Sequence, residues 1–197
     1  MDIKLTLALI AIGMTLVGYS FYFRDIFAHK TKPHAYSWLV WALLTAIAFF
    51  GQLHDNGGAG AWVTGVTAAI SFIIFFLAIK QGEKNVTRSD KINLAAALLA
   101  IVPWLLIGDP LFSVILITII DFLGFLPTIR KSWHKPYEET LIHYVLAGLK
   151  FVLAIMALET YTLTTWLYPA SLVAANLFFV IMLITRRKQH LTVETPF

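Results

Sequence analysis

The sequence contains no cysteine and few charged residues. Without cysteine, disulfide scaffolds, thiol catalysis and Cys-ligated metal sites are excluded. Only 13% of the 197 residues are charged, whereas soluble domains carry about 25%. Together with 59% hydrophobic residues and a mean hydropathy of +0.78, this excludes an ordinary soluble domain. The composition is typical of an integral, multi-pass membrane protein, which we expect in a plasma or inner membrane.

The sequence also lacks the motifs of common enzyme classes. It has no Gly-rich phosphate loop, no His-Glu-x-x-His and no nucleophile elbow. We therefore expect no enzymatic activity, no cofactor and no metal. The pI of about 9.3 does not indicate nucleic-acid binding, because too little of the chain lies outside apolar runs. The expected partners are membrane lipid and a small-molecule solute, and the sequence allows a homo-oligomer.

Apolar runs between polar segments predict seven transmembrane helices. Each run approaches the roughly 20 residues that a helix needs to cross a hydrocarbon core. The N-terminus lacks the basic region of a cleavable signal peptide, so the first run is predicted to be retained as a span. The shortest run is interrupted by Pro103. The predicted spans are 4–23, 36–54, 59–80, 92–108, 110–129, 139–158 and 163–185.

The distribution of basic residues predicts the orientation of these spans. Thirteen of the 15 Lys and Arg residues fall in segments that a seven-span chain places on one side of the membrane. Cytoplasmic loops carry the excess of Lys and Arg. The N-terminus is therefore predicted outside and the C-terminus in the cytoplasm.

Two segments of the chain, 18–33 and 124–136, predict an internal repeat. Both cover the end of a span and the basic loop that follows. The matched positions are Gly18 with Gly124, Arg24 with Arg130, and Pro33 with Pro136. A shift of four spans preserves direction across the membrane, so the repeats are predicted to be parallel.

The predicted organisation is two parallel three-helix repeats joined by a linker helix, a 3+1+3 arrangement. The first repeat, with its cytoplasmic loop, covers 1–91, and the linker helix covers 92–109. The second repeat covers 110–188, and 189–197 forms a C-terminal tail.

This arrangement, with the segment GFLPTIRKSWHK at 124–135, resembles the PQ-loop superfamily, which includes the SWEET sugar transporters. The resemblance implies a small-solute transporter that works by alternating access around a mid-membrane site. Pro127 and Thr128 stand where the family has Pro-Gln, which implies a helix-bending, gating role for Pro127. Asn176 lies in the last span, where SWEET proteins place a substrate-facing asparagine.

Two ionisable residues, Asp121 and Lys150, lie near the predicted midplane of the membrane. Each is about 11 residues into its span, or roughly 16 Å at 1.5 Å per residue. Because their spans are consecutive and antiparallel, the two charges are expected at the same depth. One interpretation is a static Asp121–Lys150 bridge. The other is a polar cavity in which Lys150 binds an anionic group or Asp121 exchanges a proton.

Polar residues at helical spacing complete the predicted site. Trp41 and Thr45 share one face of the second span, and Ser71 lies in the third. With Asn176 they suit a water-accessible cavity, although interhelical hydrogen bonds and an aromatic belt explain them as well. His143, two turns before Lys150, is predicted to be either a gate or an interfacial histidine. The ionic second repeat facing a neutral first repeat favours a polar or zwitterionic ligand.

The predicted function is therefore a small polar solute transporter. The substrate-binding candidates are Asp121, Lys150, Asn176, Ser71, Thr45 and Trp41, with Pro127 and His143 as gating residues. The alternative is a non-transporting seven-helix receptor or scaffold. A receptor needs access to its cavity from one side only, and a scaffold predicts direct contact between Asp121 and Lys150.

Overall fold

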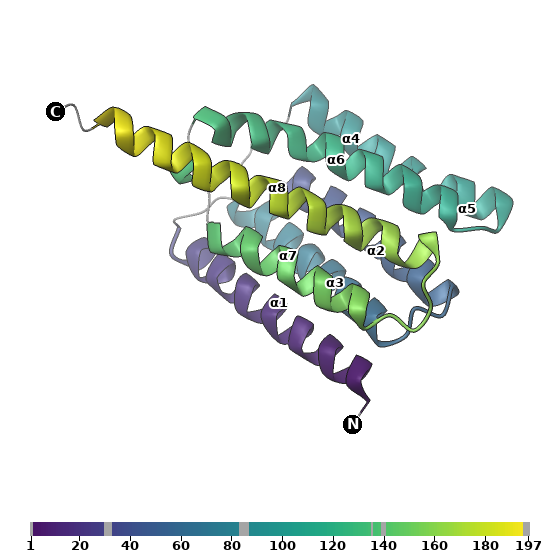
Figure 1. Cartoon of the computed structure of the whole chain (residues 1–197). Helices are drawn as coiled ribbons and strands as arrows, with labels where there is room; N and C mark the ends of the chain where they lie inside the picture. Colours follow the sequence, from purple (N-terminus) through teal and green to yellow (C-terminus); the bar gives the residue numbers. More distant parts are fainter. Residues whose placement is uncertain (1, 30–32, 83–86, 135, 139–140, 195–197) are drawn as a thin grey trace.

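In the described part of the chain, all regular secondary structure is helical, as predicted. The computed structural model describes residues 2–29, 33–82, 87–134, 136–138 and 141–194, without the side chains of residues 126–128, 130–131, 138 and 190–194. Its helices lie side by side in one bundle (Figure 1). The elements are α1 (Ile3–Phe27), α2 (Ala35–His54), α3 (Ala59–Gln81), α4 (Arg88–Leu99), α5 (Val102–Ile107), α6 (Leu111–His134), the short 3-10 helix η1 (Pro136–Glu138), α7 (Leu141–Met156) and α8 (Leu163–Glu194).

Five helical segments are long and apolar enough to cross a membrane, which agrees with the prediction of a helical membrane protein. Two shorter apolar helices occupy the places of the remaining predicted spans. The five are Ile3–Phe27, Ala35–His54, Ala59–Gln81, Arg88–Ile107 and Leu163–Gln189, and the two are Leu111–Phe125 and Leu141–Met156.

The predicted span 92–108 is divided into α4 and α5. A capping box starts α4: the Thr87 hydroxyl accepts from the Asp90 N–H, and the Asp90 carboxylate accepts from the Thr87 N–H. Pro103 lies in the first turn of α5, where its missing N–H leaves no helical hydrogen bond unmade. Gly108 ends α5 with φ +77°, a backbone conformation that favours glycine.

The last two predicted spans differ in length from the helices that form. α7 ends at Met156, two residues before the predicted end of its span. α8 continues to Glu194, because good helix formers follow its apolar part. The predicted tail 189–197 therefore begins inside this helix.

The helices pack as two groups of three with matching contacts. In the first helix group, α3 packs on both α1 and α2; in the second, α8 packs on both α6 and α7. Between the groups, α1 packs on α7 and α2 on α6, while α3 contacts α7 and α8 contacts α2. Each contact has a counterpart when α1, α2 and α3 are exchanged for α6, α7 and α8. α4 lies outside this symmetry and packs on α2 and α6.

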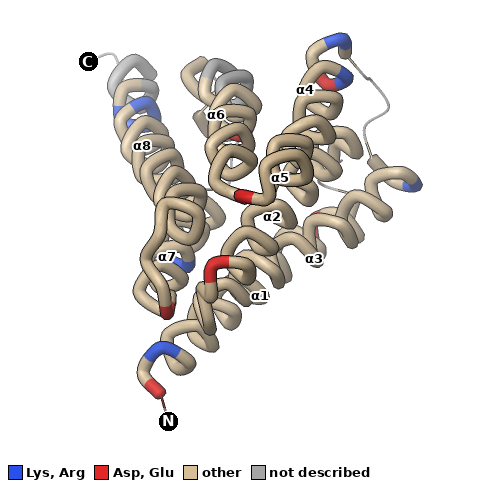
Figure 2. Tube along the Cα trace, turned by 90° about the vertical axis from the view of Figure 1, so that its right-hand side faces the viewer, with Lys and Arg blue, Asp and Glu red and all other residues tan. Residues whose placement is uncertain are grey.

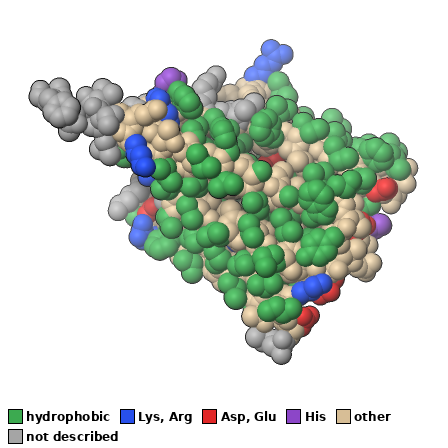
Figure 3. Space-filling model, viewed as in Figure 1, with side chains coloured by type: hydrophobic (Ala, Val, Ile, Leu, Met, Phe, Trp, Pro, Cys, Tyr) green, Lys and Arg blue, Asp and Glu red, His purple; other side chains and the backbone are tan. Residues whose placement is uncertain are grey.

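Small side chains bring the two helix groups together. Ala8 and Ala11 of α1 form a buried cluster with Ala154 at the end of α7 and Ala157 after it. Such residues let helices approach closely within a membrane. Large apolar side chains instead cover the outer surface of the bundle (Figure 3), as expected for a surface that faces lipid.

The two ends of the bundle differ in charge (Figure 2). We call the end at which α1 and α3 end and α4 begins the basic end. It carries Arg24, Lys80 and Arg88, together with Arg186 in the C-terminal part of α8. The opposite, acidic end carries Asp2 before α1, Asp55 after α2, Asp109 before α6 and Glu159 after α7, together with Lys4.

Candidate functional site

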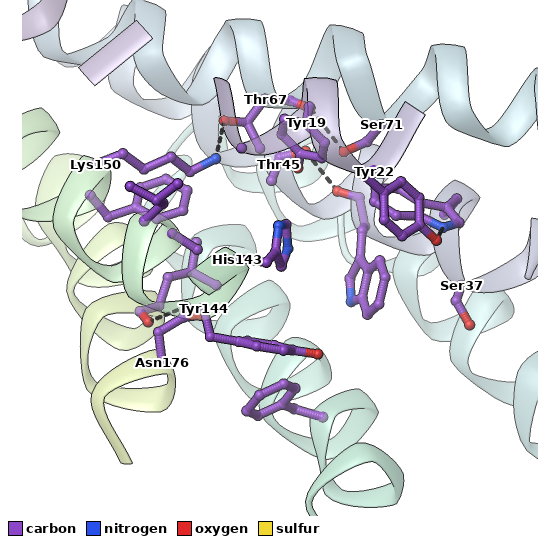
Figure 4. A pocket seen from close by; sticks show the side chains of 18 of the residues that line it. Tyr19, Tyr22, Ser37, Thr45, Thr67, Ser71, His143, Tyr144, Lys150 and Asn176 are labelled. Carbon is purple, nitrogen blue, oxygen red and sulfur yellow. Dashed lines mark hydrogen bonds between the residues drawn. The ribbon is translucent and has the colours of Figure 1, made fainter. Parts of the chain in front are cut away.

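A cavity of about 440 Å³ lies between the two helix groups. All six helices of these groups line it, and its walls reach from Lys150 in mid-bundle to Asp25 and Ser37 at the basic end. The cavity brings together every residue predicted for the substrate site, together with His143. These predicted residues are Trp41, Thr45, Ser71, Asp121, Lys150 and Asn176. Figure 4 labels Thr45, Ser71, Lys150 and Asn176 among them, as well as His143.

The amino group of Lys150 is buried in the cavity wall, with 4% of the residue exposed. Its Nζ donates a hydrogen bond of 3.0 Å to the Thr67 hydroxyl on α3. It also lies 5.2 Å from the ring centre of Tyr19 and 4.7 Å from that of Phe151, where the faces of the rings attract a cation. Lys150 therefore links the two helix groups through a neutral hydroxyl and aromatic rings.

The predicted static bridge between Asp121 and Lys150 does not form. Among the described residues, no ion pair joins them within 4.0 Å, and Lys150 bonds to Thr67 instead. The physical reason is the packing order: α8 packs on both α6 and α7 and holds these consecutive helices apart. Asp121 on α6 and Lys150 on α7 thus line one cavity from different helices.

Three predicted polar residues donate side-chain hydrogen bonds to backbone carbonyls of their own helices. The Thr45 hydroxyl donates to the Trp41 carbonyl at 2.6 Å, and the Ser71 hydroxyl donates to the Thr67 carbonyl at 2.8 Å. Asn176 donates from Nδ2 to the Leu172 carbonyl at 2.7 Å. A hydroxyl that donates in this way retains lone pairs for a further partner. These side chains therefore offer acceptor oxygens at the cavity wall.

Aromatic side chains line the cavity towards its basic end, and we call Tyr19, Tyr22, Trp38, Trp41, His143 and Tyr144 the aromatic cluster. The indole N–H of Trp38 donates to the Tyr22 hydroxyl at 3.2 Å. His143 on α7 lies 6.0 Å from Tyr19 on α1, ring centre to ring centre, so the cluster connects both helix groups. Sequence reasoning missed the tyrosines, because aromatic residues near the ends of membrane spans resemble an interfacial belt.

The second helix group contains a proline within α6, Pro127, and a proline within α8, Pro169. Pro127, the predicted gating residue, lies in α6, whose backbone stays helical to His134; its side chain lies outside the described residues. Pro169 lies inside α8 and was not predicted. Because Pro169 has no N–H, the carbonyl of Thr165 four residues earlier lacks its helical donor. The amide of Gln52 on α2 donates to that carbonyl instead, at 2.7 Å.

This exchange of partners gives a testable prediction for Gln52→Leu. The Thr165 carbonyl is buried, so losing its donor is expected to cost about 1–2 kcal/mol of stability. Adding Pro169→Ala restores an N–H to α8 and is expected to recover most of the loss. Unfolding temperatures of the two single variants and the double variant measure the coupling. Additive effects would show that Pro169 and Gln52 act independently.

Other contacts between the helix groups close the acidic end of the cavity. The Thr162 hydroxyl donates to the Asp55 carboxylate at 2.7 Å, and the backbone N–H of Glu159 donates to the Gly57 carbonyl at 3.0 Å. Lys4 forms an ion pair of 3.0 Å with Glu159. Together with the Gln52–Thr165 bond we call these contacts the acidic-end seal. They join α2, the loop after it and the start of α1 to the loop after α7 and the start of α8.

The seal is expected to weaken in acid. Burial acts to raise the pKa of Asp55, but hydrogen bonds from His54, Thr162 and Thr164 outweigh it and hold that pKa below its ordinary value. The charged form is thus favoured by folding, so its contribution is complete above the ordinary pKa of about 3.9 and is lost as pH falls through the lowered folded-state pKa.

Asp55→Asn tests this contribution through the pH dependence of the unfolding temperature. Between about pH 5 and pH 3, the variant is expected to lose less stability than the unchanged chain, because the charge-dependent part is gone. Thr162→Val, which removes one donor and keeps the carboxylate, is expected to fall between the two. Identical pH profiles for all three proteins would contradict the assignment.

No group of three or more His, Cys, Asp or Glu side chains that could hold a metal ion occurs among the described residues. Comparison of the chain with protein-family models, curated proteins and solved structures finds no significant match. The cavity itself therefore carries the functional argument.

Proposed function

We propose that the protein is a small polar solute transporter that works by alternating access in a plasma or inner membrane. One observation carries this proposal: the polar cavity between two symmetrically packed helix groups reaches the basic end and is closed at the acidic end by the seal. Rocking one group against the other would open the seal and close the aromatic cluster. The site would then face the opposite side of the membrane.

The matching contacts of the two helix groups support a 3+1+3 arrangement of parallel repeats. In this arrangement α4 and α5 together form the linker that returns the chain across the membrane. The positive-inside rule then places the basic end in the cytoplasm and the N-terminus outside. The described conformation is accordingly the one in which the cavity faces the cytoplasm.

The alternatives make different demands on the cavity. A closed scaffold predicts contact between Asp121 and Lys150, and their separation across the cavity argues against it. A receptor would keep its cavity accessible from one side only. Access from the acidic end is therefore the property that distinguishes a transporter from a receptor.

Cysteine labelling tests this property on a chain that has no cysteine of its own. Ala147 lines the cavity one turn from Lys150, so Ala147→Cys places a single thiol there. A membrane-impermeant maleimide is applied to membrane vesicles of each orientation. We expect fast labelling from the basic side and slower but measurable labelling from the acidic side.

Leu149→Cys is the matched control, because Leu149 lies two residues away and is 50% exposed on the outside of the bundle. A thiol facing lipid is expected to resist the polar reagent from both sides. If Ala147→Cys is labelled from the basic side alone, even after long exposure, the transporter proposal is wrong and the receptor alternative gains.

A further inference from the structure

This inference rests on the proposed function and names the substrate class of the same cavity. We infer that the cavity takes a zwitterion with a flat aromatic body. Its anionic group binds Lys150, its cationic group faces Asp121, and its ring packs against the aromatic cluster.

The anionic group is assigned from the surroundings of Lys150. The only hydrogen bond that its ammonium makes among the described residues goes to the Thr67 hydroxyl, and no carboxylate lies within 4.0 Å. An ammonium carries three donors, and a buried charge is costly unless an opposite charge compensates it. A ligand carboxylate at the cavity wall would supply that charge and accept a remaining donor.

The cationic group is assigned from the position of Asp121. Its carboxylate lines the same cavity, yet α8 keeps α6 away from α7, so Lys150 does not neutralise it. Among the described residues Asp121 makes no ion pair. A neutral solute would compensate neither the charge of Lys150 nor that of Asp121. A simple anion would compensate Lys150 and leave Asp121 uncompensated. A zwitterion that reaches both walls compensates each charge with one molecule.

The aromatic body is assigned from the walls between these charges and the basic end. Tyr22 lies 5.1 Å from Trp38, ring centre to ring centre, and Trp38 lies 5.2 Å from Trp41. Figure 4 shows the rings of Tyr19, Tyr22 and Tyr144 around the cavity. Aromatic rings prefer edge-to-face or offset contacts at such distances. A cavity of about 440 Å³ falls within the usual range for small-molecule sites.

Five probes, each a whole molecule, test the three groups by direct binding to the full chain in lipid nanodiscs. L-Phenylalanine and L-tryptophan carry the ring and both charges, and at least one of them is expected to bind. Phenylalaninamide lacks the carboxylate, 3-phenylpropionate lacks the amine, and L-alanine lacks the ring. Each deletion is expected to weaken binding at least tenfold relative to L-phenylalanine. If only L-tryptophan binds, the corresponding derivatives of tryptophan are used and compared with L-tryptophan.

Two variants assign the charges to residues. In Lys150→Met, the amide and the parent amino acid are expected to bind equally, because the group that distinguishes them is gone. In Asp121→Asn, the parent and its deaminated analogue are expected to bind equally. Leu172→Met, which keeps an apolar side chain of similar size in the wall of the same cavity, is expected to keep both preferences.

The inference is overturned if neither amino acid binds, or if removing either charged group or the ring leaves affinity unchanged. The probe series needs no variant, so it stays decisive even where a substitution prevents folding. The labelling of Ala147→Cys uses no ligand. Labelling from both sides without binding of these probes would therefore contradict the zwitterionic substrate but not the transporter proposal. Labelling from one side only, together with binding, would contradict the transporter proposal but not the zwitterionic ligand.

Discussion

Lys150→Met is expected to abolish recognition of a carboxylate ligand while leaving the protein folded. A hydrogen bond to a charged group contributes about 1.5–3 kcal/mol, which corresponds to a loss of affinity of roughly 10- to 150-fold. Thr67 keeps its own hydrogen bond to the Val63 carbonyl at 2.8 Å, so the wall of α3 stays in place. Calorimetric titration with L-phenylalanine or L-tryptophan measures the loss.

The stability of this variant separates a binding role from a structural one. Burying a charge that no opposite charge compensates is costly, and Lys150 makes no ion pair among the described residues. The unfolding temperature of Lys150→Met is therefore expected to stay equal or rise. Lys80→Met removes an exposed charge at the basic end and serves as the control. A Lys150→Met protein that unfolds several degrees earlier than this control would mean that Lys150 holds the helix groups together.

Gly60→Ala is expected to be among the most destabilising of single methyl additions. A Cβ at this position would lie 2.4 Å from the Ala154 carbonyl oxygen and 2.8 Å from the Leu158 nitrogen, both of them backbone atoms. Because backbone atoms cannot rotate away, α3 must separate from the end of α7. Overpacking of this kind costs about 1–3 kcal/mol, and we expect the upper end of that range.

Gly13→Ala is the matched control for that substitution. Nothing lies within 4 Å of a Cβ at Gly13, and alanine exceeds glycine in helix propensity by about 1 kcal/mol, so this variant is expected to unfold at an equal or higher temperature. Since Gly60 donates its N–H to the Ala157 carbonyl beside the seal, Gly60→Ala is also expected to speed labelling of Ala147→Cys from the acidic side. Equal unfolding temperatures for the two glycine variants would contradict the close contact of α3 with α7.

The sequence predicted where individual helices begin and end better than it predicted which helices pack against each other. The predicted spans 36–54 and 59–80 agree with α2 and α3 to within a residue or two, because polar residues 55–58 interrupt the hydropathy sharply. The interpretation in which Asp121 and Lys150 form a static bridge was wrong for a different reason. It assumed that consecutive helices are neighbours, and hydropathy contains no signal that α8 packs between α6 and α7.

The candidate site was partly predictable because, as for the membrane spans, the signal is the contrast between polar and apolar residues along the sequence. A polar or charged residue in the middle of an apolar run is conspicuous, and all five such candidates line one cavity together with Trp41. The tyrosines of the aromatic cluster and Pro169 carry no comparable signal. Their roles depend on partners from other helices, such as Gln52, which completes the hydrogen bond that Pro169 leaves open.

Alternating access is tested most directly by distances between spin labels at both ends of the bundle. Leu53 and Leu163 are exposed on either side of the seal, and Phe27 and Ile142 are exposed at the basic end. A cysteine is introduced at both residues of one pair at a time and is spin-labelled. The distance between the two labels, measured in nanodiscs, then reports on the separation of the helices at that end of the bundle. Alternating access predicts a second, longer distance for the acidic-end pair and a second, shorter distance for the basic-end pair. The populations of the two are expected to change together when the seal is weakened by Gln52→Leu. A single unchanged distance at the acidic end under all conditions would contradict it.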